Sequence, residues 1–370
     1  MSNARQLSPA LVGRFLAYTT ERHQCVAMAT TVSSPASGIV VRDSNPLAAV
    51  RRAESAAYTS LVLVDLGAWT REFAFPDSPT ILEAPGTIVP ISVDSWASSL
   101  LHDGAHAVFT PSKFIRLGDW PSLRAVLEAG ETATLPGVVT LVATDAAMLD
   151  SQYLPRFAET LAITSRPLAL LFAAKNPPLQ QRGRMASLRQ LMTQVPGCLL
   201  LATEPIVAAD ACAHGAASAA VGISGGLRKP RRPGDLGGGD ARDFLPGLFL
   251  RELWEHRSPG IYADWYANSP SPTCLACGGR ALDAFDNDEA DKEAVLRHNA
   301  HTWLAVLDEL RAKNPVQQRR WLAEEWSSAL AAHLSLRPAM GSVDADRVLR
   351  QLVELDDPMG RRTTLQGELR

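Results

Sequence analysis

The chain has 370 residues, of which 46% are hydrophobic and 20% charged, and its formal net charge at pH 7 is −3. This composition supports a large buried core and excludes an extensively disordered chain. The small net charge gives no chain-wide attraction for nucleic acid, and five cysteines with one close pair form no disulfide framework. No apolar run is long enough to span a bilayer, and the N-terminus lacks a signal-peptide pattern. We therefore expect a cytoplasmic protein with no membrane partner.

Unbroken apolar runs alternate with helical segments in the first two thirds of the chain. Such runs, without polar alternation, are typical of parallel strands buried on both faces. Two of the intervening helices are expected at Leu154–Thr164 and Arg184–Gln194. The repeated strand–helix order predicts an α/β fold, and the leading version is a (β/α)8 barrel. The expected strands are Ser60–Asp65, Ala107–Thr110, Val138–Thr144, Leu168–Ala174, Cys198–Thr203 and Ala219–Ser224.

The character of the sequence changes after Arg228. A loop rich in proline, glycine and charge, "RKPRRPGDLGGGD", is followed by a second loop and then by a helix expected at 288–313. That helix carries a one-sided apolar stripe and ends before Pro315, and a further helix is expected at Gln317–Leu334. The predicted organisation is an N-terminal extension (1–54), the main part of the barrel (55–245), a zinc-binding subdomain with the final barrel helix (246–314), and a helical segment with a tail (315–370).

Several polar side chains follow the predicted strands directly. In parallel barrels the reactive groups stand at the C-terminal strand ends, so these residues are expected to meet at one mouth. Each acid could equally cap the helix that follows it. Trp69, just after the Asp65 strand, is the best placed tryptophan for stacking on a planar ligand. The strand-end residues are Asp65, Thr110, Asp145, Lys175 with Asn176, Glu204 and Ser224.

A cysteine pair and a histidine pair suggest a metal centre. Cys274 and Cys277 form C-x-x-C in a loop, and His298 and His301 follow on the predicted helix at 288–313. Two thiolates and two imidazoles would complete a tetrahedral zinc shell. The alternative is a free cysteine pair with two surface histidines, since a single C-x-x-C is a weak signal.

Basic residues cluster just beyond the last predicted strand. This loop suits contacts to nucleic-acid phosphates, although a plain solvated loop fits the pattern equally well. Its basic residues are Arg228, Lys229, Arg231 and Arg232.

Taken in order, these features resemble the tRNA-guanine transglycosylase superfamily. "DLGAWT" from Asp65 and "DGAHAVFTPS" from Asp103 are similar to two of its motifs. Asp145 falls on its base-recognition acid, "HGAASAAVGISGGLR" on its nucleophile motif, and "PTCLAC" with "LRHN" on its zinc ligands. The similarity runs from Tyr58 to Arg311.

The resemblance implies a zinc-bearing barrel that exchanges a guanine or 7-deazaguanine base in tRNA or DNA. Asp65 would be the catalytic acid, base or nucleophile. Asp145, Lys175, Asn176, Glu204 and Trp69 would bind the purine or 7-deazapurine base. A homodimer or a partner subunit is also implied.

Two departures from the family pattern put that activity in doubt. The family nucleophile falls on Ala220 and the first zinc cysteine on Pro272. An acid elsewhere, Asp235, Asp240 or Glu204, could supply the nucleophile.

Two alternatives stay open. The first is a non-catalytic homologue that binds nucleic acid or a partner subunit. The second is an unrelated barrel lyase or aldolase, in which Lys175 forms a Schiff base with Asp145 and Glu204 as acid–base partners.

Overall fold

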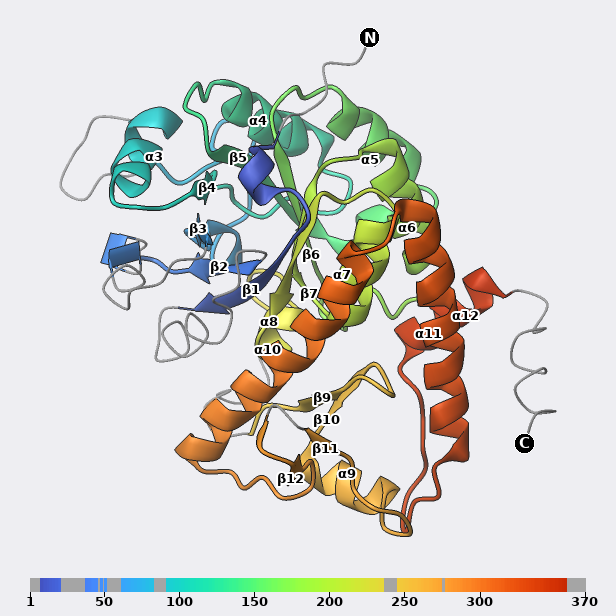
Figure 1. The fold of residues 1–370 in the computed structure, drawn as a ribbon. Helices are drawn as coiled ribbons and strands as arrows, with labels where there is room; N and C mark the ends of the chain where they lie inside the picture. Colours follow the sequence, from blue (N-terminus) through green and yellow to red (C-terminus); the bar gives the residue numbers. More distant parts are fainter. Residues whose placement is uncertain are drawn as a thin grey trace.

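The computed structural model describes residues 7–20, 37–45, 47–48, 50–51, 61–82, 91–235, 245–274 and 277–357. Eight parallel strands form a closed barrel in the order β1 to β8, and pairing of β1 with β8 completes the ring. Figure 1 shows the barrel with its helices around it and a smaller unit below. The strands are β1 (Arg14–Thr20), β2 (Ser37–Arg42), β3 (Leu61–Asp65), β4 (Ala107–Phe109), β5 (Val138–Asp145), β6 (Leu168–Ala173), β7 (Leu199–Thr203) and β8 (Ser218–Gly222).

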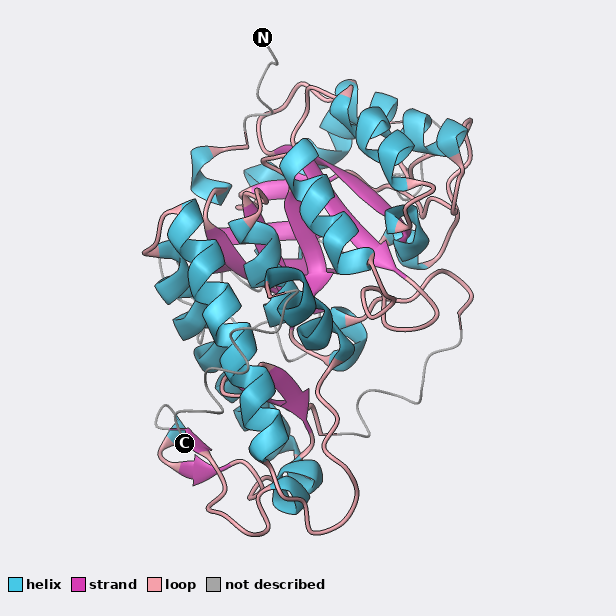
Figure 2. Ribbon diagram, turned by 90° about the vertical axis from the view of Figure 1, so that its right-hand side faces the viewer, coloured by secondary structure: helices cyan, strands magenta, loops and turns pink. Residues whose placement is uncertain are grey.

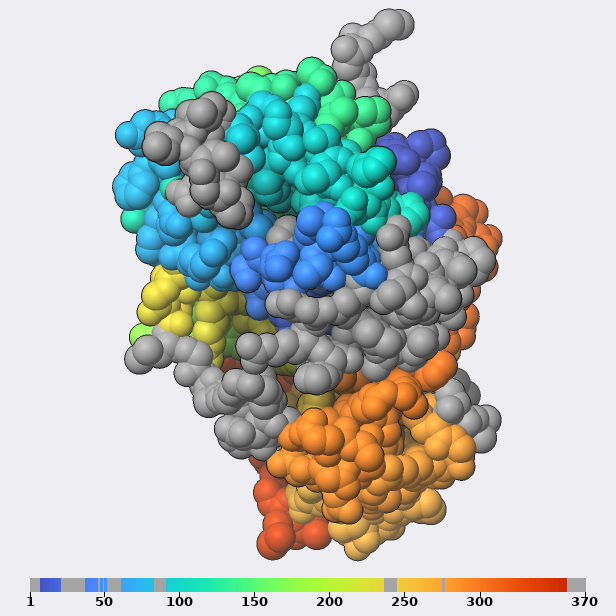
Figure 3. Space-filling model, turned by 90° about the vertical axis from the view of Figure 1, so that its left-hand side faces the viewer, coloured from blue at the N-terminus to red at the C-terminus, as the bar shows by residue number. Residues whose placement is uncertain are grey.

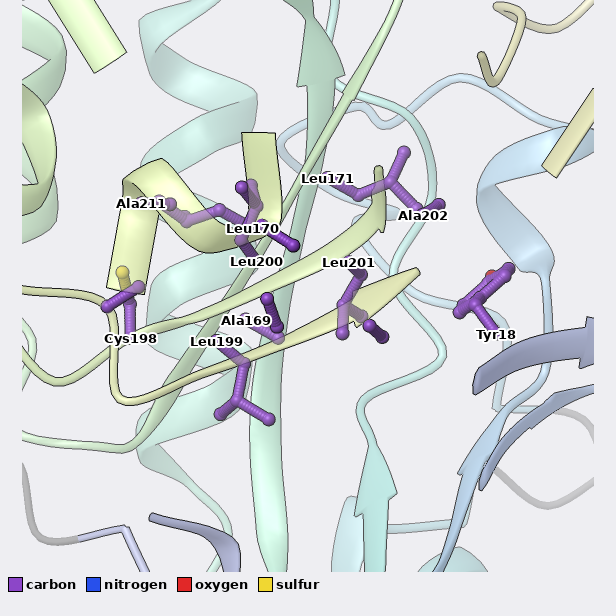
Figure 4. Close-up of a cluster of buried hydrophobic side chains, with 14 of the residues drawn as sticks. Tyr18, Ala169, Leu170, Leu171, Cys198, Leu199, Leu200, Leu201, Ala202 and Ala211 are labelled. Atoms are coloured by element: carbon purple, nitrogen blue, oxygen red, sulfur yellow. The ribbon is translucent and has the colours of Figure 1, made fainter. Parts of the chain in front are cut away.

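The barrel core follows from the apolar strands. Every residue of β3 to β8 is buried, because one face of each strand fills the interior and the other meets the surrounding helices. Figure 4 shows this packing where leucines of β6 and β7 lie close to Cys198 and to Ala211 of α7 (Pro205–Ala213). Tyr18 of β1 belongs to the same buried cluster.

Helices cover the outside of the ring, and Figure 2 shows the strands enclosed by them. Short 3-10 turns η1 (Pro9–Leu11), η2 (Ala68–Thr70) and η3 (Ala146–Leu149) complete this part. The remaining barrel helices are α3 (Val93–His102), α4 (Trp120–Glu131), α5 (Leu154–Ala162), α6 (Arg184–Gln194) and the short α8 (Gly225–Arg228).

The C-terminal subdomain has a separate small core. The hairpin β9 (Leu248–Leu250) with β10 (Glu255–Arg257), helix α9 (Pro259–Trp265) and the hairpin β11 (Thr273–Cys274) with β12 (Arg280–Ala281) build it. It appears below the barrel in Figure 3. Its buried apolar residues are Leu248, Leu253, Tyr262, Trp265, Leu282, Phe285 and Val295.

The long helices α10 (Glu289–Arg311) and α11 (Pro315–Ser335) join this subdomain to the barrel, and the shorter α12 (Arg347–Asp356) follows them. Helix α10 contacts β9 in the subdomain and both β1 and α7 in the barrel. Helix α11 packs on α7, and α12 packs on α6, α7 and α11. Asn314 caps α11 in a capping box with Gln317, and Pro315 stands at the first helical position, where its missing N–H is harmless.

The expected barrel is confirmed, and each of the six expected strands is present within one or two residues. The residues expected as an N-terminal extension supply β1 and β2 instead. The helix expected at 288–313 is α10, and the one at Gln317–Leu334 is α11. Helix α12, expected as part of a tail, buries Val348, Leu349, Leu352 and Val353 against the barrel helices. No helix in the described residues is long and apolar enough to cross a membrane.

Gly222, at the end of β8, lies where α8 approaches the barrel closely. A Cβ on Gly222 would stand 2.3 Å from the carbonyl carbon of Leu227 and 2.4 Å from the backbone nitrogen of Arg228. Since both are backbone atoms, the turn would have to move. We expect Gly222→Ala to lower the free energy of unfolding by about 1–3 kcal/mol. Urea unfolding measures this.

Gly225→Ala is the matched control, because its added Cβ meets nothing within 4 Å. Equal stability of the two variants would contradict the close approach of α8 to β8.

Candidate functional site

Asp65 stands at the end of β3, as expected, but in a closed environment. Its carboxylate accepts hydrogen bonds from the Tyr18 hydroxyl, from the Trp69 indole N–H at 3.0 Å and from the Gly67 backbone N–H at 2.8 Å. Asp65 and Trp69 are each 1% exposed. Burial, with the nearby Asp65 charge as a second cause, raises the pKa of Tyr18 well above its usual value. The cluster therefore fixes the turn after β3, and the Trp69 ring is packed rather than open for stacking.

Asp145 lies at the end of β5, and both of its oxygens are engaged. Oδ1 accepts from the Ala147 backbone N–H at 2.8 Å and so caps η3. Oδ2 pairs with Nη1 of Arg232 at 3.0 Å, and Arg232 also pairs with Asp235 at 2.9 Å. The hydrogen bond from Arg232 is the main cause that lowers the pKa of Asp235.

A cavity of about 970 Å³ opens between these strand ends and α12. Asp145, Lys175 and Asn176 line it together, as the sequence predicted for one mouth. Most of the charged side chains on its wall are cationic, whereas Asp145 and Glu354 are the acids. The cations are Lys175, Arg182, Arg184, Arg232, Arg347 and Arg350.

These cations differ in how they are paired. Arg184 is buried and pairs with Asp150 at 2.9 Å, Arg182 lies 3.7 Å from Glu354, and Arg350 lies 3.0 Å from Asp344. Within the described part of the chain, Lys175 and Arg347 have no ion-pair partner closer than 4.0 Å. Both are exposed at the cavity wall and available to a ligand.

Sequence reasoning missed Arg347 and its neighbours on α12. Gln180 donates to Asp346 at 2.8 Å, and the Gly183 N–H donates to the Gln351 side chain at 3.1 Å. These bonds hold α12 against the loop that follows β6. The available signal was the i, i+1, i+4, i+5 apolar pattern of α12, which marks a packed helix rather than a tail.

A second cavity, of about 290 Å³, lies where β7 and β8 meet the β9–β10 hairpin. Glu204 lines it and pairs with Lys229 at 3.2 Å. Burial raises the pKa of Glu204. Glu204 thus stands on a different cavity from Lys175, its expected partner in a Schiff-base site.

The basic loop after β8 does not form one exposed patch. Arg228 is buried, Lys229 pairs with Glu204, and Arg232 pairs with Asp145 and Asp235. Arg231 is exposed. The four side chains therefore lie in different environments. Their contact with nucleic-acid phosphates stays a prediction.

Three of the four expected metal ligands come together in the C-terminal subdomain. The ligand atoms of Cys274, Cys277 and His298 all lie within 4.8 Å of one another. The His298 Nδ1 lies 3.4 Å from the Cys277 sulfur, and its Nε2 lies 2.9 Å from the Phe249 carbonyl oxygen. His301 is exposed and does not belong to this group.

Comparison with known proteins found little. No family model and no curated protein matches the chain. Among solved structures, it is similar to YagE, a prophage protein of E. coli K12 that belongs to the dihydrodipicolinic acid synthase family and was solved in complex with pyruvate. The identity is 10%, the match covers 95% of this chain and 98% of that one, and the TM-score is 0.35. A likeness at this level carries no conclusion about what this chain binds.

The resemblance to tRNA-guanine transglycosylases was wrong. No family model matches the chain, and the solved structure named above belongs to another family. Acids at strand ends and glycine-rich turns occur in parallel barrels of many kinds, so short collinear matches were not specific. Base exchange, and a non-catalytic role in that superfamily, are set aside with it.

Ala220 is a fully buried position of β8 that pairs with Leu16 of β1, not a replaced nucleophile. Asp240, considered as a substitute, lies outside the described residues. The nucleic-acid and dimer partners stay untested predictions.

The Asp65 cluster predicts a large stability effect. Asp65→Ala would leave the Tyr18 hydroxyl, the Trp69 N–H and the Gly67 N–H without their acceptor inside the core. We expect a loss of about 3–5 kcal/mol in the free energy of unfolding, measured by urea denaturation.

Asp77→Ala, at an exposed position, is the control and should stay within about 0.5 kcal/mol of the parent. A stable Asp65→Ala protein would mean that the carboxylate has another role than fixing this turn.

Proposed function

We propose that the mouth cavity binds a small carbonyl compound that carries an anionic group, and that Lys175 forms an imine with it. The observation that carries this proposal is the pair of cations without ion-pair partners, Lys175 and Arg347, on the wall of one cavity at the C-terminal end of the barrel. An amine that is not engaged in an ion pair is available to attack a carbonyl carbon.

The surrounding charges support an anionic ligand. Guanidinium groups recognise carboxylates and phosphates by paired, charge-assisted hydrogen bonds. Arg347 and Arg350 lie on α12, so the ligand's anionic group would face that helix while its carbonyl faces the strand ends. The cavity volume is in the range of small-molecule sites.

The chemistry needs only groups of the site and water. The neutral Lys175 amine forms a C–N bond to the carbonyl carbon, its two N–H protons pass to the carbonyl oxygen, the C–O bond breaks as that oxygen leaves as water, and an imine remains. Asp235 is the carboxylate whose charge interacts with Lys175. Its negative charge would stabilise the protonated form of the imine. Asp145, held by Arg232, would orient the guanidinium rather than transfer protons.

The proposal predicts covalent trapping at one lysine. With pyruvate, the simplest 2-oxo acid, or a phosphorylated aldehyde, borohydride reduction should add one ligand mass at Lys175. Peptide mass spectrometry locates the adduct among the five lysines of the chain. Arg347→Gln should lower the yield at limiting ligand about tenfold or more, because a hydrogen bond to a charged group is lost.

Lys175→Met should abolish the adduct, and Lys313→Met, outside the cavity, should not. Labelling spread equally over the five lysines would contradict a specific imine site.

We also infer a structural zinc site at Cys274, Cys277 and His298. The donor set fits zinc, which takes thiolates and imidazoles in closed four-coordinate sites. The Phe249 carbonyl would fix the orientation of the His298 ring, as partners of metal-bound histidines commonly do. Gly278 and Gly279 have positive φ angles, and the Gly279 N–H donates to the Cys274 carbonyl at 3.0 Å, which folds the two cysteines to the same side. His301 or water would be the fourth ligand.

The zinc proposal predicts about one equivalent of metal per purified chain, measured by atomic absorption. Cys277→Ala should lose the metal and lower the melting temperature, because metal binding contributes to folding of a small subdomain. Cys212→Ala, at a cysteine of α7, is the control that keeps the metal. Metal-free protein whose stability is unaffected by added zinc would contradict the site.

A further inference from the structure

The wall of the smaller cavity beside β7 and β8 carries a buried cation, Arg228, that has no ion-pair partner, although the charge of Glu204 on the same wall acts on it from a greater distance. Arg228 is 6% exposed, and its guanidinium donates from Nη1 to the carbonyls of Gly222 and Ile223, both at 3.3 Å. Its Nε has no hydrogen-bond partner. In the described part of the chain no carboxylate lies within 4.0 Å of Arg228. A buried charge is costly unless an opposite charge or several hydrogen bonds compensate it.

The neighbouring charges on this cavity already have partners. Lys229 pairs with Glu204 at 3.2 Å, and Arg257 pairs with Glu255, which also accepts from His333 at 2.8 Å. Asp346, also on the wall, accepts from the Gln180 side chain and caps α12. Arg228 is therefore the cation on this wall with no carboxylate at ion-pair distance.

A histidine adds a second unpartnered group to the same cavity. His256 lies on the wall with Arg228, and its ring lies tilted by 44° against Phe249, with 5.0 Å between the ring centroids. Its Nε2 is buried and has no hydrogen-bond partner. Burial, with the Arg228 and Lys229 charges as further causes, lowers the pKa of His256 well below its usual value. A neutral imidazole can donate one N–H to an acceptor.

We propose that this cavity is an oxyanion-binding site, in which Arg228 and His256 hold a phosphate or carboxylate group. The group would accept hydrogen bonds from the Arg228 guanidinium and from the His256 ring. Because Arg228 belongs to the barrel and His256 to the β9–β10 hairpin, a bound anion would join the subdomain to the barrel. This site lies on a different cavity from Lys175, so it stands independently of the imine proposal.

The test compares melting temperatures of the full chain in inorganic phosphate, acetate and chloride at equal ionic strength. Phosphate, acetate or both should raise the melting temperature along a binding curve, because a ligand bound only to the folded state stabilises it. The anion that raises the melting temperature at the lower concentration is the one that the site prefers. Arg228→Met should weaken the apparent affinity at least tenfold, whereas Arg228→Lys should keep part of it.

Arg124→Gln, at an exposed position of α4 that lines neither cavity, is the matched control and should leave this response intact. If Arg228→Met does not fold, the His256 ring resonances of the parent protein provide a second measurement. They should shift with anion concentration, and the stabilisation should weaken in His256→Gln. Two results would overturn the proposal. One is an equal rise in melting temperature in the parent, in Arg228→Met and in His256→Gln. The other is a set of His256 resonances that do not shift with anion concentration.

Discussion

Closure of the barrel between β1 and β8 is the constraint on which the rest of the structure depends. Five residue pairs, from Arg14 with Ser218 to Tyr18 with Gly222, set this register. The register carries Tyr18 into the core beside Asp65, and it lets the Ile223 N–H donate to the Tyr18 carbonyl at 3.1 Å. The chain can then turn back through α8 only because Gly222 has no side chain. Arg228 is buried by that turn, so a backbone requirement places a charge inside the protein.

The C-terminal subdomain is an extension of the barrel rather than an independent addition. Helix α10 belongs to both, since it contacts β9 in the subdomain and β1 and α7 in the barrel. Helices α11 and α12 return along α7 and α6. The return of α12 provides one wall of the mouth cavity. Residues more than 160 positions apart, such as Gln180 and Gln351, therefore line one cavity.

Local chemistry at the strand ends explains why sequence motifs misled. Asp65 and Asp145 stand where catalytic acids stand in many parallel barrels, yet each also accepts backbone N–H groups of the turn that follows. An acid that ends a strand and caps the next turn satisfies a structural need in any member of this fold class. A series of such acids in the expected order therefore indicates the architecture and not the reaction.

The sequence by itself determined the barrel class, because short unbroken apolar runs that alternate with helical segments are typical of parallel strands covered on both faces. It also identified the cysteine pair and His298, since the C-x-x-C spacing and the helix register are local properties. It missed β1 and β2, whose residues were taken as an extension. Only the tertiary structure decided which charges are compensated. Lys229, Arg228 and Arg232 are nearly adjacent in the chain, but one pairs with Glu204, one is buried without a carboxylate, and one pairs with Asp145. Partners of that kind come from distant strands and helices, and no local pattern records them.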